Sequence, residues 1–347
     1  MPPELFHSDE GYRSAFSAGL GRLLGDDRLG SFVLVLANAS YDPQIRETLD
    51  PAIRERFQVL AARLRDDLVR GRPHGQPADD LLVFLKLMAV GLDALEPVRQ
   101  RRAGPWELQY NPLRSFRPAR MSSGRVTGLH RPFDPAGFHF NRPFLEQETL
   151  WRGRLQGREC ALFYNKFPFA PLHGLLVVEP ARELPQFLDH GHHDYLWEVT
   201  RALGAGMPGV GFGYNARGAF ASVNQLHFQM FVRDAGRYPV ESEQWRHNGG
   251  EADYPVPCRL FREPAAAWEA IGELHRREQP YNLLYRPGRL YLVPRAGQGS
   301  RPQAAWSGGF AWSEVAGAFT VSNVSDFHRL RAGEISRELA RLAVAGA

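Results

Sequence analysis

The sequence contains very little cysteine. Only Cys160 and Cys258 occur among its 347 residues, so neither a disulfide framework nor a four-cysteine zinc site can form. Long apolar runs are also missing, because no stretch reaches about 18 uninterrupted apolar residues. Residues 1–5 do not begin a basic segment followed by an apolar run, the pattern of a leader peptide. We therefore expect a soluble, cytoplasmic protein with no membrane partner.

Lysine is scarce as well. Lys86 and Lys166 are two of the 42 basic residues and the rest are arginine, a bias that alone indicates no function. The formal net charge of +4 suits an anionic small molecule as well as a polyanion. Because no basic stripe with interleaved aromatic residues is present, we expect no nucleic-acid partner. The 44% of hydrophobic residues can form the core of one large or two ordinary domains.

Apolar periodicity divides the chain into a helical part and two strand-rich parts. Residues 1–104 read mostly as helix, with helical spacing at 43–70 and again at 81–95. In the next part, 105–235, the expected strands are 155–164, 174–178, 210–215 and 225–232, with a helix at about 188–205. Residues 236–257 form a connection or flap, and residues 258–347 hold a hairpin at 281–295 and a last helix at 332–343. This order of elements predicts an α+β fold with an antiparallel sheet.

Residues 214–231 carry the clearest chemical pattern. Their loop contains small and amide residues, Asn215, Gly218 and Ser222. In the strand that follows, three polar residues alternate with apolar ones: Gln225, His227 and Gln229. Alternate side chains of a strand share a face, and a neutral imidazole between amides is suited to attack on phosphorus. A half-buried strand with its polar face toward water gives the same pattern.

This run resembles the histidine-triad superfamily, in the branch of galactose-1-phosphate uridylyltransferase, diadenosine tetraphosphate phosphorylase and the GDP-hexose phosphorylases. These proteins carry a His-x-His-x-Gln strand after an Asn-containing loop. Three further segments are similar to that branch: residues 163–177, residues 109–123 and the hairpin at 281–295. The resemblance covers about residues 105–325. It implies a histidine-triad-like antiparallel sheet with flanking helices, in two such halves, with the N-terminal helical region packed on the core.

The resemblance assigns roles residue by residue. It makes His227 the nucleophile that forms a covalent nucleotidyl-histidine. It also gives Gln229 a hydrogen bond to a phosphoryl oxygen, which favours transferase or phosphorylase chemistry over the hydrolysis seen where a third histidine stands there. The expected nucleotide- or phosphate-binding residues are Asn165 at the ribose position, His173, Asn215, Gly218, Ser222 and Gln225. Asn165 equally suits a turn, and Ser222 a cap at the strand entry.

Gln225 departs from the pattern of the resembled branch. It replaces a histidine that, in the uridylyltransferases, can ligate a structural metal together with an upstream Cys-x-x-Cys. Residues 131–143 contain no cysteine, so we expect no zinc and no other cofactor, with room only for loosely bound magnesium. The main-chain carbonyl of residue 225 can still orient the Nδ1–H of His227. The histidines at 190, 192 and 193 fit a solvated helix start better than a metal site.

The sequence thus predicts a nucleotidyltransferase or phosphorylase that acts on a sugar nucleotide or a dinucleoside polyphosphate through His227. Because attack needs a neutral imidazole, we expect activity to fall as the pH drops through the histidine pKa, ordinarily about 6.5. The alternative is a catalytically silent nucleotide-binding or sensor protein on the same fold, which Gln225 leaves open. Base, sugar and acceptor specificity and the oligomeric state also stay open.

Overall fold

The computed structural model describes residues 3–73, 75–117, 124–233 and 236–344. The helices are α1 (Asp9–Leu23), α2 (Leu29–Tyr41), α3 (Pro43–Val69), α4 (Ala78–Val90), α5 (Pro112–Ser115), α6 (His190–Gly204), α7 (Pro264–Arg276), α8 (Trp312–Val315), α9 (Val324–Arg329) and α10 (Ala332–Ala340). Short 3-10 helices are η1 (Glu4–Phe6), η2 (Pro143–Glu148), η3 (Pro180–Arg182), η4 (Pro239–Glu241) and η5 (Arg246–Asn248). The strands are β1 (Arg99–Ala103), β2 (Trp106–Tyr110), β3 (Thr149–Leu155), β4 (Arg158–Tyr164), β5 (Gly174–Val178), β6 (Val210–Asn215), β7 (His227–Val232), β8 (Arg259–Phe261), β9 (Tyr281–Arg286), β10 (Arg289–Pro294) and β11 (Ala318–Val321).

An eight-stranded sheet forms the centre of the molecule. Its order is β3-β4-β5-β7-β6-β9-β10-β8, and every neighbouring pair is antiparallel. The pairing of β6 with β9 joins the strands of both strand-rich parts in this one sheet. A smaller sheet has the order β1-β2-β11, in which β11 runs parallel to β2. The predicted α+β fold with an antiparallel sheet is confirmed.

The two faces of the central sheet contribute to different cores. Phe228 and Met230 of β7 belong to the larger core, which also contains apolar residues of α1–α4, α6 and α7. Phe231 lies on the other face, in a core that it shares with Trp312 of α8, and the two rings stack 5.1 Å apart. Gly213 of β6 has no side chain in the place where the Trp312 indole lies, and a Cβ there would overlap that ring. By alternation along β7, His227 and Gln229 share the Phe231 face.

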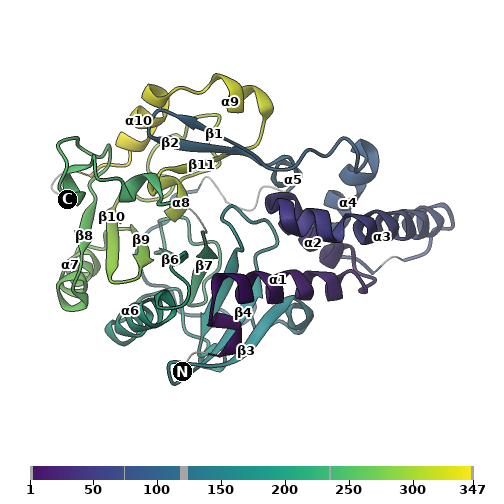
Figure 1. The fold of residues 1–347 in the computed structure, drawn as a ribbon, viewed down its shortest axis with the longest axis horizontal. Helices are drawn as coiled ribbons and strands as arrows, with labels where there is room; N and C mark the ends of the chain where they lie inside the picture. Colours follow the sequence, from purple (N-terminus) through teal and green to yellow (C-terminus); the bar gives the residue numbers. More distant parts are fainter. Residues whose placement is uncertain (1–2, 74, 118–123, 234–235, 345–347) are drawn as a thin grey trace.

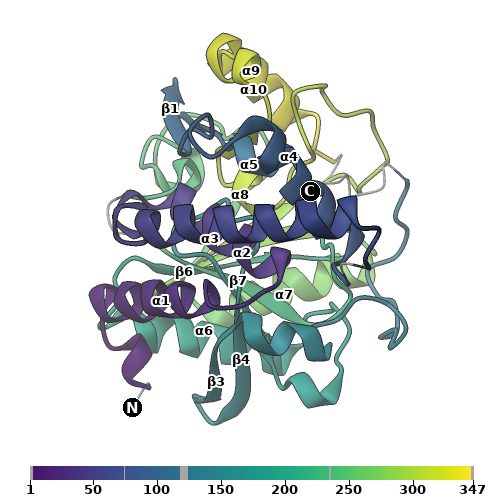
Figure 2. The ribbon, with the colours of Figure 1, turned by 90° about the vertical axis from the view of Figure 1, so that its right-hand side faces the viewer.

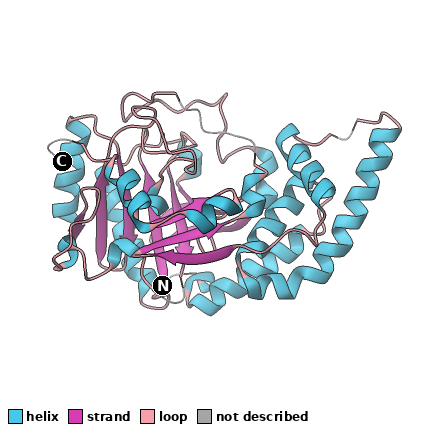
Figure 3. Cartoon of the chain, turned by 90° about the horizontal axis from the view of Figure 1, so that it is seen from above, coloured by secondary structure: helices cyan, strands magenta, loops and turns pink. Residues whose placement is uncertain are grey.

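The N-terminal helices gather beside the central sheet (Figures 1 and 2), and in the view from above the strands lie between helices on both sides (Figure 3). The helix predicted at 43–70 is confirmed as α3. It begins at Asp42, whose Oδ1 accepts the backbone N–H of Gln44 at 3.0 Å and of Ile45 at 3.2 Å, and Pro43 occupies the first turn, where it needs no backbone N–H. Among the described residues, no helix combines the length and the apolar character needed to span a membrane.

Two sequence predictions needed correction. The segment expected to be helical up to residue 104 ends in β1, which pairs with β2 across a tight turn with Gly104 at φ +60°. The four polar residues that open β1 have no apolar stripe with which a helix could pack. The run expected as one strand at 155–164 spans the turn between β3 and β4, where Gln156 and Gly157 both have positive φ. The strands at 174–178 and 210–215 and the hairpin at 281–295 are confirmed.

Candidate active site

A cavity of about 640 Å³ lies against β7. Its lining comes from α2 and α4 with their flanking loops, from α5 and the residues just after it, from the segment 138–148, from the end of β4 with the turn after it, from β5, and from β7 with the preceding loop. Among the sequence-predicted site residues, it brings together Asn165, Ser222, His227 and Gln229. The N-terminal helical region therefore forms a wall of this cavity, which the sequence did not indicate.

His227 stands at the start of β7 with its ring largely removed from solvent. Its exposed fraction is 5%, and its Nδ1 lies 2.8 Å from the backbone oxygen of Gln225. A neutral ring that donates from Nδ1 to this carbonyl carries its lone pair on Nε2. Burial lowers the pKa of His227 to about 4, and the hydrogen bond to the Gln225 carbonyl opposes this shift only in part. The imidazole is therefore neutral at neutral pH and available as a nucleophile.

Gln186 holds the backbone of His227 in place. Its Oε1 accepts the His227 N–H at 3.0 Å, and its Nε2 donates to the carbonyl oxygens of His227 at 3.3 Å and of Asn215 at 3.0 Å. Gln186 is 2% exposed, so these bonds form where water does not compete. The carboxamide thus fixes the first residue of β7 where the strand meets the loop. The sequence analysis missed this residue because nothing near it in the chain marks its partner 41 positions away.

Gln229 is held by the protein interior. Trp312 donates its Nε1–H to Gln229 Oε1 at 2.9 Å, and the Gln229 side chain also interacts with the His173 ring, where it favours the protonated form. Burial, with the positive charge of Arg114, lowers the pKa of His173 to about 3, so this ring is also neutral. A carboxamide fixed in this way presents a constant hydrogen-bonding group to the cavity.

Asn165 combines the two roles that the sequence left open. Its Oδ1 accepts the backbone N–H of Phe167 at 3.0 Å, which stabilises the turn after β4. Its Nδ2 lies 3.4 Å from both ring nitrogens of His173, and the residue lines the cavity. His173 itself lies behind this lining with 0% exposure. Ser222 is exposed at the cavity wall.

Besides His173, three predicted site residues do not line the cavity. Asn215 Oδ1 accepts the Trp312 backbone N–H at 2.8 Å and the Asn282 Nδ2–H at 2.7 Å, so its carboxamide oxygen serves the protein interior. Gly218, with φ +81°, lies against Pro280 and supplies its carbonyl to the backbone N–H of residue 298. Gln225 Oε1 accepts the Phe140 N–H at 2.7 Å. All three thus make contacts within the protein, and their role in nucleotide binding stays a prediction.

One end of the cavity carries a buried charged cluster. Lys166 Nζ lies 2.7 Å from Asp80 Oδ1 and 3.9 Å from Glu148 Oε1, and all three residues line the cavity. Burial raises the pKa of Glu148, although Lys166 opposes the shift. Gly30 of α2 makes the cluster possible, because a Cβ at this position would overlap the Asp80 carboxylate. One ammonium group faces two carboxyl groups, so acceptor oxygens outnumber the cationic donors.

Aromatic rings form the wall next to His227. Phe140 is 3% exposed, and its ring centre lies 5.0 Å from that of His227 and 5.5 Å from that of Phe163. Phe138 and Phe144 line the same cavity, and 48% and 51% of their surfaces are exposed. Exposed phenylalanines beside an open cavity are suited to stack on a planar group of a ligand.

Arg114 adds positive charge at the cavity floor. Its Nη1 donates to the Phe167 carbonyl at 2.8 Å, and its guanidinium lies 4.9 Å from the Phe169 ring centre. Burial lowers the pKa of Arg114, while the carboxylate of Glu314 opposes the shift. A guanidinium keeps its charge under such conditions and binds phosphate well.

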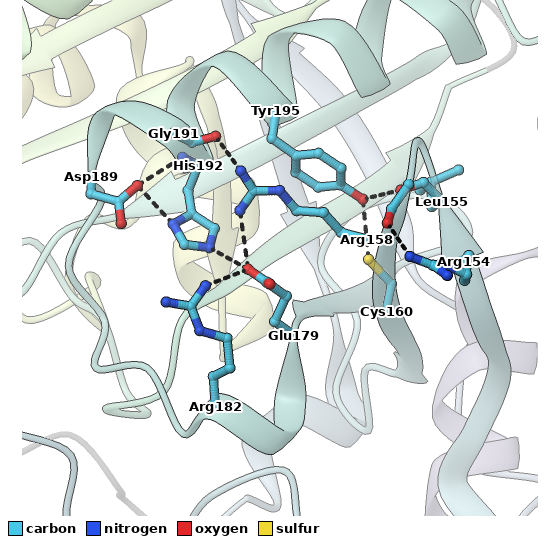
Figure 4. A network of polar contacts seen from close by, with 11 residues as sticks. Arg154, Leu155, Arg158, Cys160, Glu179, Arg182, Asp189, Gly191, His192 and Tyr195 are labelled. Atoms are coloured by element: carbon cyan, nitrogen blue, oxygen red, sulfur yellow. Dashed lines mark hydrogen bonds and ion pairs between the residues drawn. The ribbon is translucent and has the colours of Figure 1, made fainter.

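Among the histidines after residue 189, His192 belongs to a network of polar contacts outside the cavity (Figure 4). Asp189 caps α6, and its Oδ1 lies 2.7 Å from His192 Nδ1, while Glu179 Oε2 lies 3.2 Å from His192 Nε2. His192 and His193 are 2% and 0% exposed, so the prediction of a solvated helix start is wrong for these two. Packing against the sheet buries them, and carboxylates, a phenol and a carbonyl satisfy their nitrogens.

No group of three His, Cys, Asp or Glu side chains within the described ranges could hold a metal ion. His139, in the cysteine-free segment 131–143, is 7% exposed and packs against Phe133, with ring centres 5.3 Å apart. The expectation of no zinc and no other cofactor stays a prediction. Residues 118–123, part of the segment that resembles the phosphorylases, lie outside the described residues.

Comparison with known proteins places this site in context. Residues 106–231 match a family model described as GDPGP1-like, N-terminal domain. Human GDP-D-glucose phosphorylase 1 is 35% identical over 170 residues, which cover 42% of this chain and 41% of the human protein. Arabidopsis thaliana GDP-L-galactose phosphorylase 1 is 27% identical over 209 residues, 49% of this chain and 46% of the plant protein. The matched region thus spans less than half of each of these relatives.

A solved structure shares the fold more completely. Yeast Ap4A phosphorylase Apa2 superposes with a TM-score of 0.51 over 77% of this chain and 95% of its own, at 15% sequence identity. At that identity the likeness concerns the fold alone. Residues 106–231 are therefore similar to a GDPGP1-like N-terminal domain, and the expected resemblance of this chain to the phosphorylase branch of the histidine-triad-like superfamily is confirmed.

Proposed function

We propose that this protein is a phosphorylase of a guanosine diphosphate hexose and works through a covalent intermediate on His227. In the first step, Nε2 of His227 attacks the α-phosphorus, the N–P bond forms, and the bond from that phosphorus to the bridging oxygen breaks. Hexose 1-phosphate leaves with the electron pair of that bond. In the second step, inorganic phosphate attacks the same phosphorus, the N–P bond breaks, and GDP and neutral His227 are released.

The arrangement of His227 carries this proposal. A buried imidazole that is neutral at neutral pH, anchored through Nδ1 to a carbonyl 2.8 Å away and lining a cavity, is an activated nucleophile. The carbonyl belongs to the main chain of Gln225, so the change from histidine to glutamine at that position leaves this contact intact. This geometry favours catalysis over the silent sensor alternative.

The lining of the cavity supports a guanine base. Phe138 and Phe144 offer faces for stacking, and beyond them Asp80 and Glu148 present carboxyl oxygens. Guanine carries adjacent donors at N1 and at its exocyclic amine, and paired carboxyl oxygens can accept both. Adenine has an acceptor at N1 and would leave a buried oxygen unpaired, which costs binding. The names of the human and plant relatives agree with a guanosine diphosphate sugar.

The phosphoryl groups would lie between His227 and Arg114. The charge of Arg114 and the carboxamide of Gln229 are suited to the negative oxygens as the nucleophile attacks. Asn165 would contact the ribose, and Ser222 a phosphate oxygen. A cytoplasmic location stays a prediction of the cysteine-poor sequence.

The test is a mass measurement of the intact protein. Incubation with GDP-glucose in the absence of phosphate should add the mass of one guanylyl group, located on His227 by peptide mapping, and later addition of phosphate should remove it and release GDP. His227→Asn should give no adduct. His193→Asn removes an equally buried histidine outside the cavity and should still give one. Nucleotide binding without any adduct in the native protein would contradict catalysis and support the sensor alternative.

A further inference from the structure

A second cavity lies on the other side of the turn that follows β4. Its volume is about 680 Å³, close to that of the cavity at His227. The N-terminal helices α1, α2 and α3, the small sheet β1-β2-β11 and the residues after β7 all contribute to its lining. His227 and Gln229 are not among its lining residues, so the proposed catalysis does not use it.

The charged groups of this cavity have an excess of arginine. Arg13, Arg101, Arg102 and Arg233 line it, and the carboxylates among its described lining residues are Asp42, which is paired with Arg13, and Glu107. Arg233 binds Glu107 through a single nitrogen, since Nη2 lies 2.7 Å and 2.8 Å from the two carboxylate oxygens. Arg102 Nη2 lies 3.5 Å from Glu107 and its side chain is 68% exposed. Glu107 therefore neutralises only part of the arginine charge, and an anion would be attracted to the remainder.

Tyr238 provides an unusual polar group in the same cavity. The residue is 2% exposed, and within the described part of the chain its hydroxyl has no hydrogen-bond partner. The Arg233 guanidinium lies over its ring, 4.5 Å from the centre. A buried hydroxyl without a partner is costly to the folded protein. An oxygen of a bound ligand would satisfy this hydroxyl beside the positive charge of Arg233.

The remaining lining combines amides, hydroxyls and apolar faces. Gln44, Gln100 and Tyr41 contribute polar groups, and the Tyr41 hydroxyl donates to Gln109 Oε1 at 2.8 Å. Phe169, Phe319 and Leu108 contribute apolar surface. Amides and hydroxyls around an apolar surface match a sugar ring, which has hydroxyls at its edge and C–H groups on its faces.

We propose that this second cavity is a binding site for a phosphorylated sugar. The arginines with the Tyr238 hydroxyl would bind the phosphate, and the amides with Phe169 and Phe319 would bind the sugar. Neither the phosphate nor the hexose alone would use both parts of the lining. The proposal concerns binding outside the catalytic cavity and does not depend on the proposed function.

A side chain shared by the two cavities connects such a ligand with the active site. Phe169 lines both cavities, and its ring centre lies 4.5 Å from that of His173. The His173 ring in turn interacts with the Gln229 side chain. A ligand packed against Phe169 would therefore lie one side chain away from His173.

Hydrogen exchange of the protein locates the site, with glucose 1-phosphate as the probe. We expect protection in peptides that cover 99–110 and 236–241, which lie away from His227. Calorimetric titration should show tighter binding of glucose 1-phosphate than of glucose or inorganic phosphate. Protection confined to 222–231 would overturn the proposal, as would equal affinity for inorganic phosphate and glucose 1-phosphate, or no binding at all.

Two variants test the phosphate contacts. Tyr238→Phe removes only the unpartnered hydroxyl and should weaken glucose 1-phosphate binding in the second cavity about ten-fold, the effect of one hydrogen bond to a charged group. Arg102→Gln changes an exposed side chain and should weaken it about three-fold at low salt, as expected for a partly screened charge. Tyr110→Phe, on strand β2 but outside both cavities, is the matched control and should bind as the native protein does. Unchanged affinity in Tyr238→Phe would overturn the proposal even if the protein remains fully folded.

Discussion

Burial of His227 makes a quantitative prediction about acid. A solvent-exposed histidine with a pKa of about 6.5 is only about 9% neutral at pH 5.5, whereas a pKa of about 4 leaves about 97% of the rings neutral. Only the neutral ring can attack phosphorus. The rate of guanylyl transfer to His227 at pH 5.5 should therefore stay close to its value at pH 7.5, instead of falling about ten-fold as the unperturbed pKa implies.

Formation of the adduct must be measured separately from its transfer to inorganic phosphate. Phosphate itself titrates near neutral pH, so its own protonation would change the rate of the second step. Rapid mixing of enzyme with limiting GDP-glucose, followed by acid quench and mass analysis, gives the rate of adduct formation from pH 4 to pH 8. At limiting substrate this rate reports the free enzyme. At saturating substrate, the negative charge of the bound phosphates would stabilise the protonated His227 ring and raise its pKa. The rate would then begin to fall at a higher pH. Burial also raises the pKa of Glu148 in the same cavity. The variant Glu148→Gln therefore shows whether titration of this carboxyl group contributes to the pH dependence.

Acid also destabilises the fold, and the assay must separate this effect. The pKa of His227 is about 4 and that of His173 about 3 in the folded protein, both below the unfolded value of about 6.5. As the pH falls from 6.5 toward these folded values, the unfolded chain binds more protons. The free energy of unfolding therefore falls by about 1.4 kcal/mol per pH unit for each ring. Tryptophan fluorescence identifies the pH range in which the protein stays folded. An acid limb centred near pH 6.5 within that range would refute the idea that burial keeps His227 neutral.

Three substitutions test other contacts of the site. Gln186→Met removes three buried hydrogen bonds and should lower the free energy of unfolding by about 3 kcal/mol in urea titrations. A loss under about 1 kcal/mol would show that the Gln186 carboxamide does not hold His227 in place. Trp312→Phe removes the 2.9 Å hydrogen bond to Gln229 and should reduce kcat about ten-fold with little change in KM, so an effect on KM alone would contradict a role in positioning Gln229. Glu148→Gln should reduce kcat/KM for GDP-glucose about 10- to 100-fold and leave weak activity on ADP-glucose unchanged, and an equal loss on both would exclude base recognition.

The local pattern around His227 was predictable because strand alternation is a local property. Residues 225–230 alternate polar and apolar side chains, and the structure places Leu226, Phe228 and Met230 in the core at 0–1% exposure. The preceding loop was harder, since small polar residues suit both ligand contacts and internal hydrogen bonds. Asn215 and Gly218 serve the interior, whereas Ser222 lines the cavity. The sequence gives no indication of which neighbour each will meet.

The wall formed by the N-terminal helices could not be predicted from any single segment. In the sequence, Asp80 is one of two adjacent acidic residues before an apolar segment, and Gly30 is a single small residue before another. Their place in the site depends on how α2 and α4 pack near Lys166, which is 86 positions after Asp80 in the chain. Helix packing of this kind is set by shape complementarity between distant segments. Trp312 is a similar case, since its contact with Gln229 joins two strand-rich parts that the sequence treats separately.

Gln225 shows how a departure from a family pattern can be compatible with catalysis. The proposed role of His227 requires only the main-chain carbonyl of this residue, which lies 2.8 Å from His227 Nδ1. The side chain is then available for another contact, and its Oε1 accepts the Phe140 N–H at 2.7 Å. Phe140 in turn packs against the His227 ring. A position where some relatives can hold a metal ligand thus fixes the aromatic wall here, which excludes water from His227 and keeps its pKa low.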